Sequence, residues 1–258
     1  MKLFVVSGKR FFTAVGLFAL VMAACIGVRS ASVFKVGGRE IPVYSVQRDD
    51  NKIALTFDCA WNDTDIPSIC ETLKKHNVHA TFFVVGTWAE KYPDSVKMLA
   101  DNGHEIGNHS YNHPHYAKLS HEDMIADMDK CDAVIKSITG NDTPLFRSPY
   151  GEYNDSVIQA CDATGRTYIQ WSVDSIDYGG ADKESIIRRS TEKTAAGDII
   201  LLHNGTDNTA AALDEILTAL CTKFEPVTVS ELIYTDGYEI DHTGRQKKIE
   251  KRVEMVGD

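Results

Sequence analysis

The sequence predicts an α/β domain built on parallel strands, arranged either as a barrel or as a doubly wound sheet. Between residues 40 and 235 of the 258-residue chain, β-rich runs alternate with segments whose apolar residues recur every three or four positions. Parallel strands need crossover connections, which are usually helical, so this alternation is typical of such a sheet. One domain accounts for the whole alternation, because no internal repeat or low-complexity linker interrupts it.

The predicted strands are short, apolar and rich in β-branched or aromatic residues. Residues 52–58 (KIALTFD) form the first of them, a buried strand, and residues 79–85 (HATFFVV) form the next β-rich run. The remaining predicted strands cover residues 105–108, 145–146, 167–171, 198–202 and 227–229.

The predicted helices are amphipathic. In residues 65–77, Ile66, Ile69 and Leu73 recur at spacings of three and four. The pattern from Ser120 to Asp123 is typical of a capping box and opens another helix. We interpret the apolar stripe of that helix as core packing; it comprises Met124, Met128, Cys131, Ile135 and Ile138. Further helices are predicted over residues 95–102, 154–163, 183–194 and 208–223.

The first 31 residues are predicted to lie outside the folded domain. Lys2, Lys9 and Arg10 precede an uncharged apolar run over residues 11–28, which is the pattern of an export signal. This run is longer than the core of a typical cleaved signal and long enough to span a bilayer, so we favour an uncleaved membrane anchor over a cleaved signal peptide. Either segment would place the domain outside the cytoplasmic membrane, anchored or secreted, in the cell envelope.

The predicted organisation is a signal peptide or membrane anchor at 1–31, one domain at 40–235, and a polar segment at 236–258 that we expect to be loosely ordered. Beyond residue 31 the chain has 23 basic and 37 acidic residues, a formal charge of −14. So acidic a domain repels phosphate backbones, which disfavours a nucleic-acid partner and leaves neutral or cationic ligands. Five of the six cysteines lie beyond residue 31, and without a CxxC pair they favour neither a disulfide scaffold nor a zinc knuckle. We expect a monomer.

Five polar segments each follow a β-rich run, at the position where a parallel barrel presents its functional groups. They are residues 56–61 (TFDCAW), 109–113 (HSYNH), 147–151 (RSPYG), 171–177 (WSVDSID) and 201–204 (LLHN). Five such coincidences in one chain indicate a shared site rather than chance.

Taken in order, these motifs resemble those of the polysaccharide deacetylases of the NodB-homology class, carbohydrate esterase family 4. That family shows TFDD, HSxxH, RxPYG, DxxDW and LxH; this chain reads TFDC, HSYNH, RSPYG, DSID followed by Tyr178, and LLH. The stretch IPVYSVQRDDNKIALTFDCAW also resembles the sporulation-associated branch of the family. The resemblance covers about residues 50–235. It implies a distorted (β/α) barrel, here preceded by the N-terminal hydrophobic helix, and metal-dependent removal of acetyl groups from sugars.

The resemblance implies a divalent metal ion, zinc or alternatively cobalt, bound by His109 and His113. These histidines are four residues apart, so on a helical turn both imidazoles would face one point, as a metal site needs. A pair of surface histidines is the alternative interpretation. A metal ion there would polarise the acetyl carbonyl and acidify a bound water.

Asp58 and His203 are the candidate base and acid. Asp58 ends a buried strand and would take the proton from the attacking water; its alternative role is a capping carboxylate. His203 also follows a buried strand and would protonate the leaving amine, because the pKa of histidine lies near neutrality; its alternative role is a core histidine. By family analogy, Asp177 orients His203. The same analogy makes the backbone N–H of Tyr150 a substrate-binding donor to the oxyanion, and Arg147 a brace for the carboxylates or a purely structural ion pair.

Cys59 departs from the family pattern, because it replaces the second Asp, a metal ligand. A thiolate would suit a Cys-His-His zinc site. Equally, Cys59 could fill space while Asp63 or water completes the coordination, or metal binding could be lost. Since neighbours along a strand face opposite sides, Cys59 should point away from Asp58 unless the strand breaks there.

Three functions remain open on these grounds. The first is a metal-dependent deacetylase of N-acetylated sugars in a cell-wall or related polysaccharide, which would be its glycan partner. The second is a glycan-binding or sporulation-related protein whose catalysis is impaired by Cys59. The third is a different metal amidase on the same scaffold, since fold does not fix substrate. Sugar rings could stack on aromatic side chains, which could also be packing residues: Trp61, Tyr111, Tyr150 and Tyr178.

Overall fold

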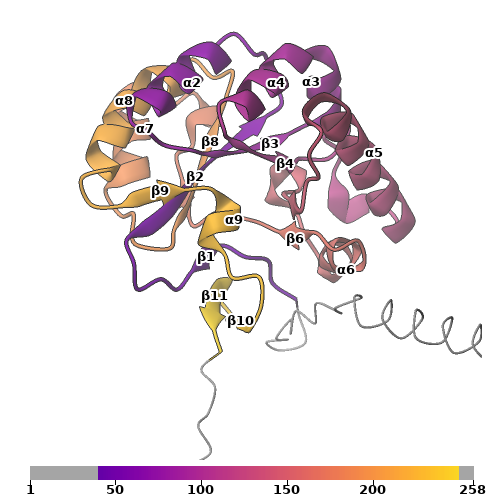
Figure 1. Ribbon diagram of the computed structural model, residues 1–258. Helices are drawn as coiled ribbons and strands as arrows, with labels where there is room; N and C mark the ends of the chain where they lie inside the picture. Colours follow the sequence, from indigo (N-terminus) through magenta and orange to yellow (C-terminus); the bar gives the residue numbers. More distant parts are fainter. Residues whose placement is uncertain (1–39, 250–258) are drawn as a thin grey trace, which may run out of the picture. The chain divides into compact units, whose positions relative to one another are not determined.

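The structure is a computed structural model that describes residues 40–249 (Figure 1). The apolar segment at residues 1–31, with the predicted signal peptide or anchor, and the last nine residues of the chain lie outside the described residues. Within residues 40–249, no helix combines the length and the apolar character needed to cross a membrane.

A parallel sheet of eight strands forms the centre of the domain, as the alternating pattern predicts. The strands are β2 (Lys52–Cys59), β3 (Thr81–Val84), β4 (Glu105–Asn108), β5 (Leu145–Phe146), β6 (Thr167–Tyr168), β7 (Val173–Asp174), β8 (Ile199–His203) and β9 (Glu225–Val227). They pair in the order β6-β5-β4-β3-β2-β8-β7, and β9 pairs with the start of β2. Every pairing in this sheet is parallel, so all carboxyl ends lie at one end of the sheet.

The sheet curls into an incomplete barrel whose edges are β6 and β7. These two strands are consecutive in the chain, and residues 169–172 join them without a helix. Ile169 donates its N–H to Phe146 beside one edge, whereas Ser172 donates its N–H to Ile199 beside the other. This short connection therefore spans the opening between the two edge strands. The sheet is thus the distorted (β/α) barrel that was predicted, and not the doubly wound alternative.

Eight α-helices are described, and the longer ones lie around the outside of the strands (Figure 1). They are α2 (Ile66–Lys75), α3 (Gly86–Lys91), α4 (Pro93–Asp101), α5 (His121–Thr139), α6 (Asp155–Ala163), α7 (Lys183–Thr191), α8 (Thr209–Leu220) and α9 (Val229–Leu232). The expected cap of α5 is present, because the Ser120 side chain accepts a hydrogen bond from the N–H of Asp123. The short elements α3 and β7 were not predicted, since six and two residues carry too little periodicity to be recognised.

Alternation along β2 divides the core into two layers. Ile53, Leu55 and Phe57 pack outward in the large cluster that includes Leu73 of α2 and Ile216 of α8. Ala54 belongs to a second cluster inside the barrel, with Phe83, Leu145, Ile169 and Ile199. The even-numbered residues of β2 therefore face the interior and the odd-numbered residues face the helices.

A second sheet of three strands corrects the expectation of a loosely ordered polar segment after residue 235. Its strands are β1 (Ser45–Val46), β10 (Tyr238–Ile240) and β11 (Arg245–Lys248), in the order β1-β11-β10. Gln246 is fully buried there and bonds both backbone groups of Tyr234. The sequence did not predict these strands, because they are short and mostly polar. Even a buried position is taken by a glutamine, whose amide is fully hydrogen-bonded.

A substitution at Gly197 would test how closely the first residues of the domain pack on the barrel. It has φ +86°, and a Cβ at this position would lie 1.7 Å from the carbonyl oxygen of Val46. We expect Gly197→Ala to lower the free energy of unfolding by about 3 kcal/mol or more, because backbone strain adds to the displacement of β1. Urea denaturation measures it. The matched control is Gly140→Ala, with φ +77° and open space around the new methyl, which should cost only about 1–2 kcal/mol. Equal losses in the two variants would show that the contact with Val46 is unimportant.

Candidate active site

The sheet register brings four of the predicted site residues together at the carboxyl end of the barrel. Asp58 of β2 lies opposite His203 of β8, and Asn108 of β4 lies opposite Phe146 of β5. His109 and Arg147 directly follow those last two residues, so they leave the sheet at the same end. All four side chains are largely or fully buried.

Arg147 and Asp58 form a buried ion pair at the centre of the site. Nη1 of Arg147 lies 2.7 Å from Oδ1 of Asp58 and also donates to Oγ1 of Thr56. Nη2 donates to the carbonyl oxygen of Gln170, and the guanidinium carbon lies 4.1 Å from the centre of the Phe83 ring. Burial alone would raise the pKa of Asp58, but the charge and hydrogen bond of Arg147, together with the nearby His109 and His203, outweigh it and the pKa falls below its usual value. Asp58 is therefore a carboxylate at neutral pH.

His109 and His113 lie beside this carboxylate. Nε2 of His109 is 3.5 Å from Oδ2 of Asp58, and the rings of the two histidines are 5.2 Å apart, edge to face. The helical turn expected for residues 109–113 is not formed, because Ser110 and His113 both have positive φ. A loop instead brings the imidazoles together, with the Ser110 hydroxyl accepting the N–H of His113.

Both imidazoles are neutral and suited to bind a metal ion. Burial lowers the pKa of His109, and burial together with His109 lowers the pKa of His113 to about 4. Nδ1 of His109 lies 2.8 Å from the carbonyl oxygen of Arg147, which requires the proton on Nδ1 and leaves the Nε2 lone pair facing Asp58. Two lone pairs that face each other across 3.5 Å repel unless a cation lies close by. The residues present thus fit a divalent ion beside His109 and His113.

Cys59 and Asp63 do not lie with these histidines. β2 continues through Cys59, so its side chain falls on the helix side, fully buried in the cluster that contains Ile66 and Ile69. Burial raises the pKa of the Cys59 thiol well above its usual value, which disfavours a thiolate. Asp63 accepts a hydrogen bond from Ser95 of α4 instead. Across residues 40–249, no three or more His, Cys, Asp and Glu side chains are grouped as a metal site.

His203 is held by Asp177 from the short helical turn Asp177–Gly179. Nδ1 of His203 lies 2.7 Å from Oδ1 of Asp177, whose Oδ2 accepts the backbone N–H of His203 and the hydroxyl of Thr209. Burial opposes a charge on His203, but the bond to Asp177 and the negative charges of Asp58 and Asp177 together outweigh it and raise the pKa of His203. The preceding Ile176 has φ +55°, a conformation that costs a β-branched residue about 1–3 kcal/mol and recurs at functional sites. The sequence analysis did not identify Thr209, because the residues next to it in the sequence form no recognisable motif.

Tyr150 lies on the turn Pro149–Gly151 with φ +60°, its ring 4.7 Å from that of His113. The large exposed side chains of the described residues include three aromatics around this site: Trp61, Tyr150 and Tyr178. Trp61 and Tyr178 flank the ring of His203 at 5.3 and 5.2 Å. Tyr111 is different: its hydroxyl donates to Glu90 and Lys130 covers its ring at 3.6 Å, so it is a packing residue.

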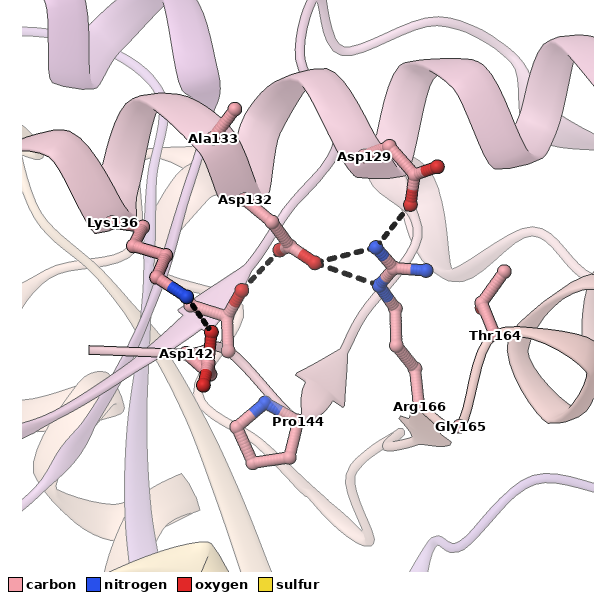
Figure 2. A pocket seen from close by; sticks show the side chains of 10 residues that line it. Asp129, Asp132, Ala133, Lys136, Asp142, Pro144, Thr164, Gly165 and Arg166 are labelled. Carbon is pink, nitrogen blue, oxygen red and sulfur yellow. Dashed lines mark hydrogen bonds and ion pairs between the residues drawn. The ribbon is translucent and has the colours of Figure 1, made fainter. Parts of the chain in front are cut away.

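A pocket of about 480 Å³ lies away from this site, at the amino ends of β5 and β6 (Figure 2). Arg166 dominates it and bonds Asp129 and Asp132 of α5, while Lys136 bonds Asp142. The cations of the pocket are thus already paired with its own carboxylates, and the network ties α5 to β6. At the amino end of a barrel such a network is typical of stability rather than chemistry.

The Asp177–His203 pair predicts a proton affinity that NMR can measure on metal-free protein. His203 should titrate above 6.5 in the wild type, and Asp177→Asn should lower its pKa below the wild-type value, since burial then acts with less opposition. Because the folded pKa is raised, this pair stabilises the fold at pH values below about 6.5 and loses that effect as the pH rises through the folded pKa. The stability deficit of Asp177→Asn should therefore be larger at pH 6 than at pH 9.

Asp174→Asn is the control for that titration, because Asp174 bonds Trp171 rather than His203. It should leave the pKa of His203 close to the wild-type value. Similar pKa values of His203 in the wild type and Asp177→Asn would contradict the orienting role of Asp177.

Comparison with known proteins agrees with this geometry. The sequence profile described as polysaccharide deacetylase matches residues 45–169. A peptidoglycan-N-acetylglucosamine deacetylase of Bacillus cereus is 35% identical over 176 residues, which are 67% of this chain but only 64% of that relative, under two thirds of its length. A second Bacillus cereus protein of that name is 33% identical over 196 residues, 74% of this chain and 92% of the relative.

The fold is shared with solved structures as well. A Bacillus anthracis protein described as a pseudoenzyme of carbohydrate esterase family 4 superposes with a TM-score of 0.72 at 31% identity, covering 80% of this chain and 72% of that one. Motif order, barrel, identity and coverage all agree. The chain belongs to the polysaccharide deacetylase family, carbohydrate esterase family 4.

Proposed function

We propose that the protein is a metal-dependent hydrolase that removes acetyl groups from N-acetylated sugars of a cell-wall polysaccharide. One observation carries this proposal: an ionised Asp58, two neutral histidines and an Asp177-backed His203 converge at the carboxyl end of the barrel. An amide hydrolase needs these groups together, because water must lose a proton and the amine must gain one.

Each side chain has a defined task in this reaction. Asp58 accepts the proton of the attacking water, and Arg147 keeps it ionised until then. The backbone N–H of Tyr150 donates to the developing oxyanion. His203 then protonates the leaving amine, and Asp177 fixes its tautomer and stabilises its charge.

His109 and His113 would hold the metal ion, with zinc favoured by its preference for imidazole nitrogen and cobalt as the alternative. A divalent ion at this place supplies Lewis acidity toward the acetyl carbonyl and toward the attacking water. Asp58 lies beside the proposed ligands, since its Oδ2 is 3.5 Å from Nε2 of His109.

A glycan substrate suits the surface around the site. Trp61, Tyr150 and Tyr178 are each about half exposed, and aromatic side chains of this kind stack on the apolar faces of sugar rings. The two Bacillus cereus relatives are named as peptidoglycan deacetylases, so peptidoglycan is the first polymer to test. That substrate lies outside the cytoplasmic membrane, as the predicted export signal or anchor at residues 1–31 would require.

A second candidate function is a glycan-binding protein with impaired catalysis, including a role in sporulation. Cys59 favours it, because the side chain at the position of the second family Asp is buried among Ile66 and Ile69 and offers no ligand. The structural relative from Bacillus anthracis, which is described as a pseudoenzyme, supports the possibility of impaired catalysis on this fold.

Metal analysis combined with acetate release from peptidoglycan and from chitin oligomers tests the two candidates. A deacetylase should retain about one divalent ion per chain and release acetate. Protein that stays metal-free in excess zinc or cobalt, and releases none, would overturn the first proposal and favour the second. Release from small acetamides but not from oligosaccharides would point to a different amidase.

The two proposed ligands predict matched losses. His109→Ala or His113→Ala should sharply weaken zinc binding and abolish acetate release, because each removes one of two imidazole ligands. Calorimetric zinc titration and acetate assays measure this, with circular dichroism to confirm folding. His115→Ala is the control, because His115 pairs with Glu152 at the rim and should leave the zinc affinity unchanged. Unaltered zinc stoichiometry in both ligand variants would show that they do not bind metal.

The base and the acid predict separable losses. Asp58→Asn should keep the metal but lose most activity, because an amide cannot accept the proton of water. His203→Ala should lower kcat by about 10²–10⁴-fold, the usual contribution of a general acid. The wild-type pH profile should fall in alkali as His203 loses its proton, and this alkaline limb should disappear in His203→Ala. A profile that keeps the limb would assign it to another group.

A further inference from the structure

Gln170 lies in the short connection between β6 and β7 and touches both halves of the site. It is 2% exposed. Its carbonyl oxygen accepts Nη2 of Arg147 at 3.1 Å, so it holds the guanidinium that pairs with Asp58. Its side-chain Nε2 donates to the carbonyl oxygen of Gly151 at 2.8 Å, so it also holds the turn that carries Tyr150.

The turn above Gln170 needs such support. Tyr150 has φ +60° and Gly151 has φ +64°, and a left-handed tyrosine persists only where its surroundings fix it. A Cβ on Gly151 would lie 2.7 Å from Cη2 of Trp171 and 3.3 Å from Oε1 of Gln170, which shows how closely the turn rests on these side chains. The bond from Gln170 to the Gly151 carbonyl holds the peptide that follows Gly151, and so fixes the end of the turn that carries Tyr150.

The hydrogen bonding of Gln170 distinguishes it from a glutamine that only stabilises the core. Among the described residues, its Oε1 is buried without a hydrogen-bond partner. An unpaired buried acceptor is unfavourable, so the amide contributes less to stability than a fully bonded one. Gln246 provides the comparison, because it is also buried but uses both its Nε2 and its Oε1 on Tyr234.

We propose that Gln170 is a positioning residue, which keeps the oxyanion donor of Tyr150 at a fixed place relative to the Arg147–Asp58 pair. This inference rests on the proposed deacetylase function and extends it to a residue outside the family motifs. Its backbone carbonyl acts on one side and its side-chain amide on the other, so a substitution at position 170 keeps the contact with Arg147 and removes the bond to the turn, together with a longer bond of 3.5 Å to the Tyr168 hydroxyl.

Gln170→Met tests this link in the zinc-loaded full chain, since methionine keeps the length and the backbone carbonyl but loses the Nε2 donor. With chitin oligomers, kcat should fall by about 10²-fold while KM changes less than about twofold, because the donor acts on the oxyanion rather than on bound substrate. The amide NMR signals of Tyr150 and Gly151 should shift, while those of Asp177 and His203 stay in place. Gln246→Met should lower the melting temperature at least as much yet leave kcat unchanged.

Unchanged kcat together with unshifted Tyr150 and Gly151 signals in Gln170→Met would overturn the proposal. An equal fall of kcat in Gln246→Met would do the same, since any buried glutamine would then have that effect. If the wild type releases no acetate, the deacetylase proposal fails separately and the NMR comparison alone decides the role of Gln170. Should Gln170→Met not fold, Gln170→Leu is measured in its place.

Discussion

The guanidinium of Arg147 has no access to solvent, and the geometry of the site follows from how its charge is satisfied. Burying an ion costs several kcal/mol, which is recovered only when its donors are paired. Asp58, Thr56 and the carbonyl of Gln170 provide that pairing, and the ring of Phe83 lies against the guanidinium plane. The carbonyl of Arg147 itself fixes the tautomer of His109. Arg147 thus influences both the charge of Asp58, the proposed base, and the lone pair that His109, a proposed metal ligand, leaves free. Removing Arg147 would leave a buried carboxylate unpaired, at a cost of about 3–5 kcal/mol.

Periodicity and motif order were sufficient to predict the parallel sheet, the barrel and the strand ends that carry Asp58 and His203. They worked because alternation reports burial, and parallel strands place their carboxyl ends together. The geometry of the loops could not be predicted in the same way. His109 and His113 meet through positive φ at Ser110 and His113 rather than through a helical turn, and no periodicity encodes that. The site contacts of Thr209 and Gln170 depend on partners far along the chain, so neither residue shows a local signal.

Strand alternation also explains why Cys59 and Asp58 have different environments. β2 remains paired through Cys59, and the N–H of Val85 donates to the Cys59 carbonyl, so the side chain must face the apolar layer under α2. A thiol tolerates that layer, whereas a carboxylate would require the strand to break or would be buried without a partner. Cysteine at this position is therefore consistent with a strand that runs one residue further.

This difference determines the charge that any bound metal ion would meet. Two neutral imidazoles contribute no charge, and the carboxylate beside them, Asp58, is already neutralised by Arg147. A divalent ion here would keep more of its positive charge than one bound by an additional carboxylate, which strengthens its Lewis acidity but weakens its retention. Retention of the ion therefore decides between the two proposed functions. With the ion bound, the site would polarise an acetyl carbonyl strongly. With the ion lost, the exposed side chains of Trp61, Tyr150 and Tyr178 still offer a surface for sugar rings.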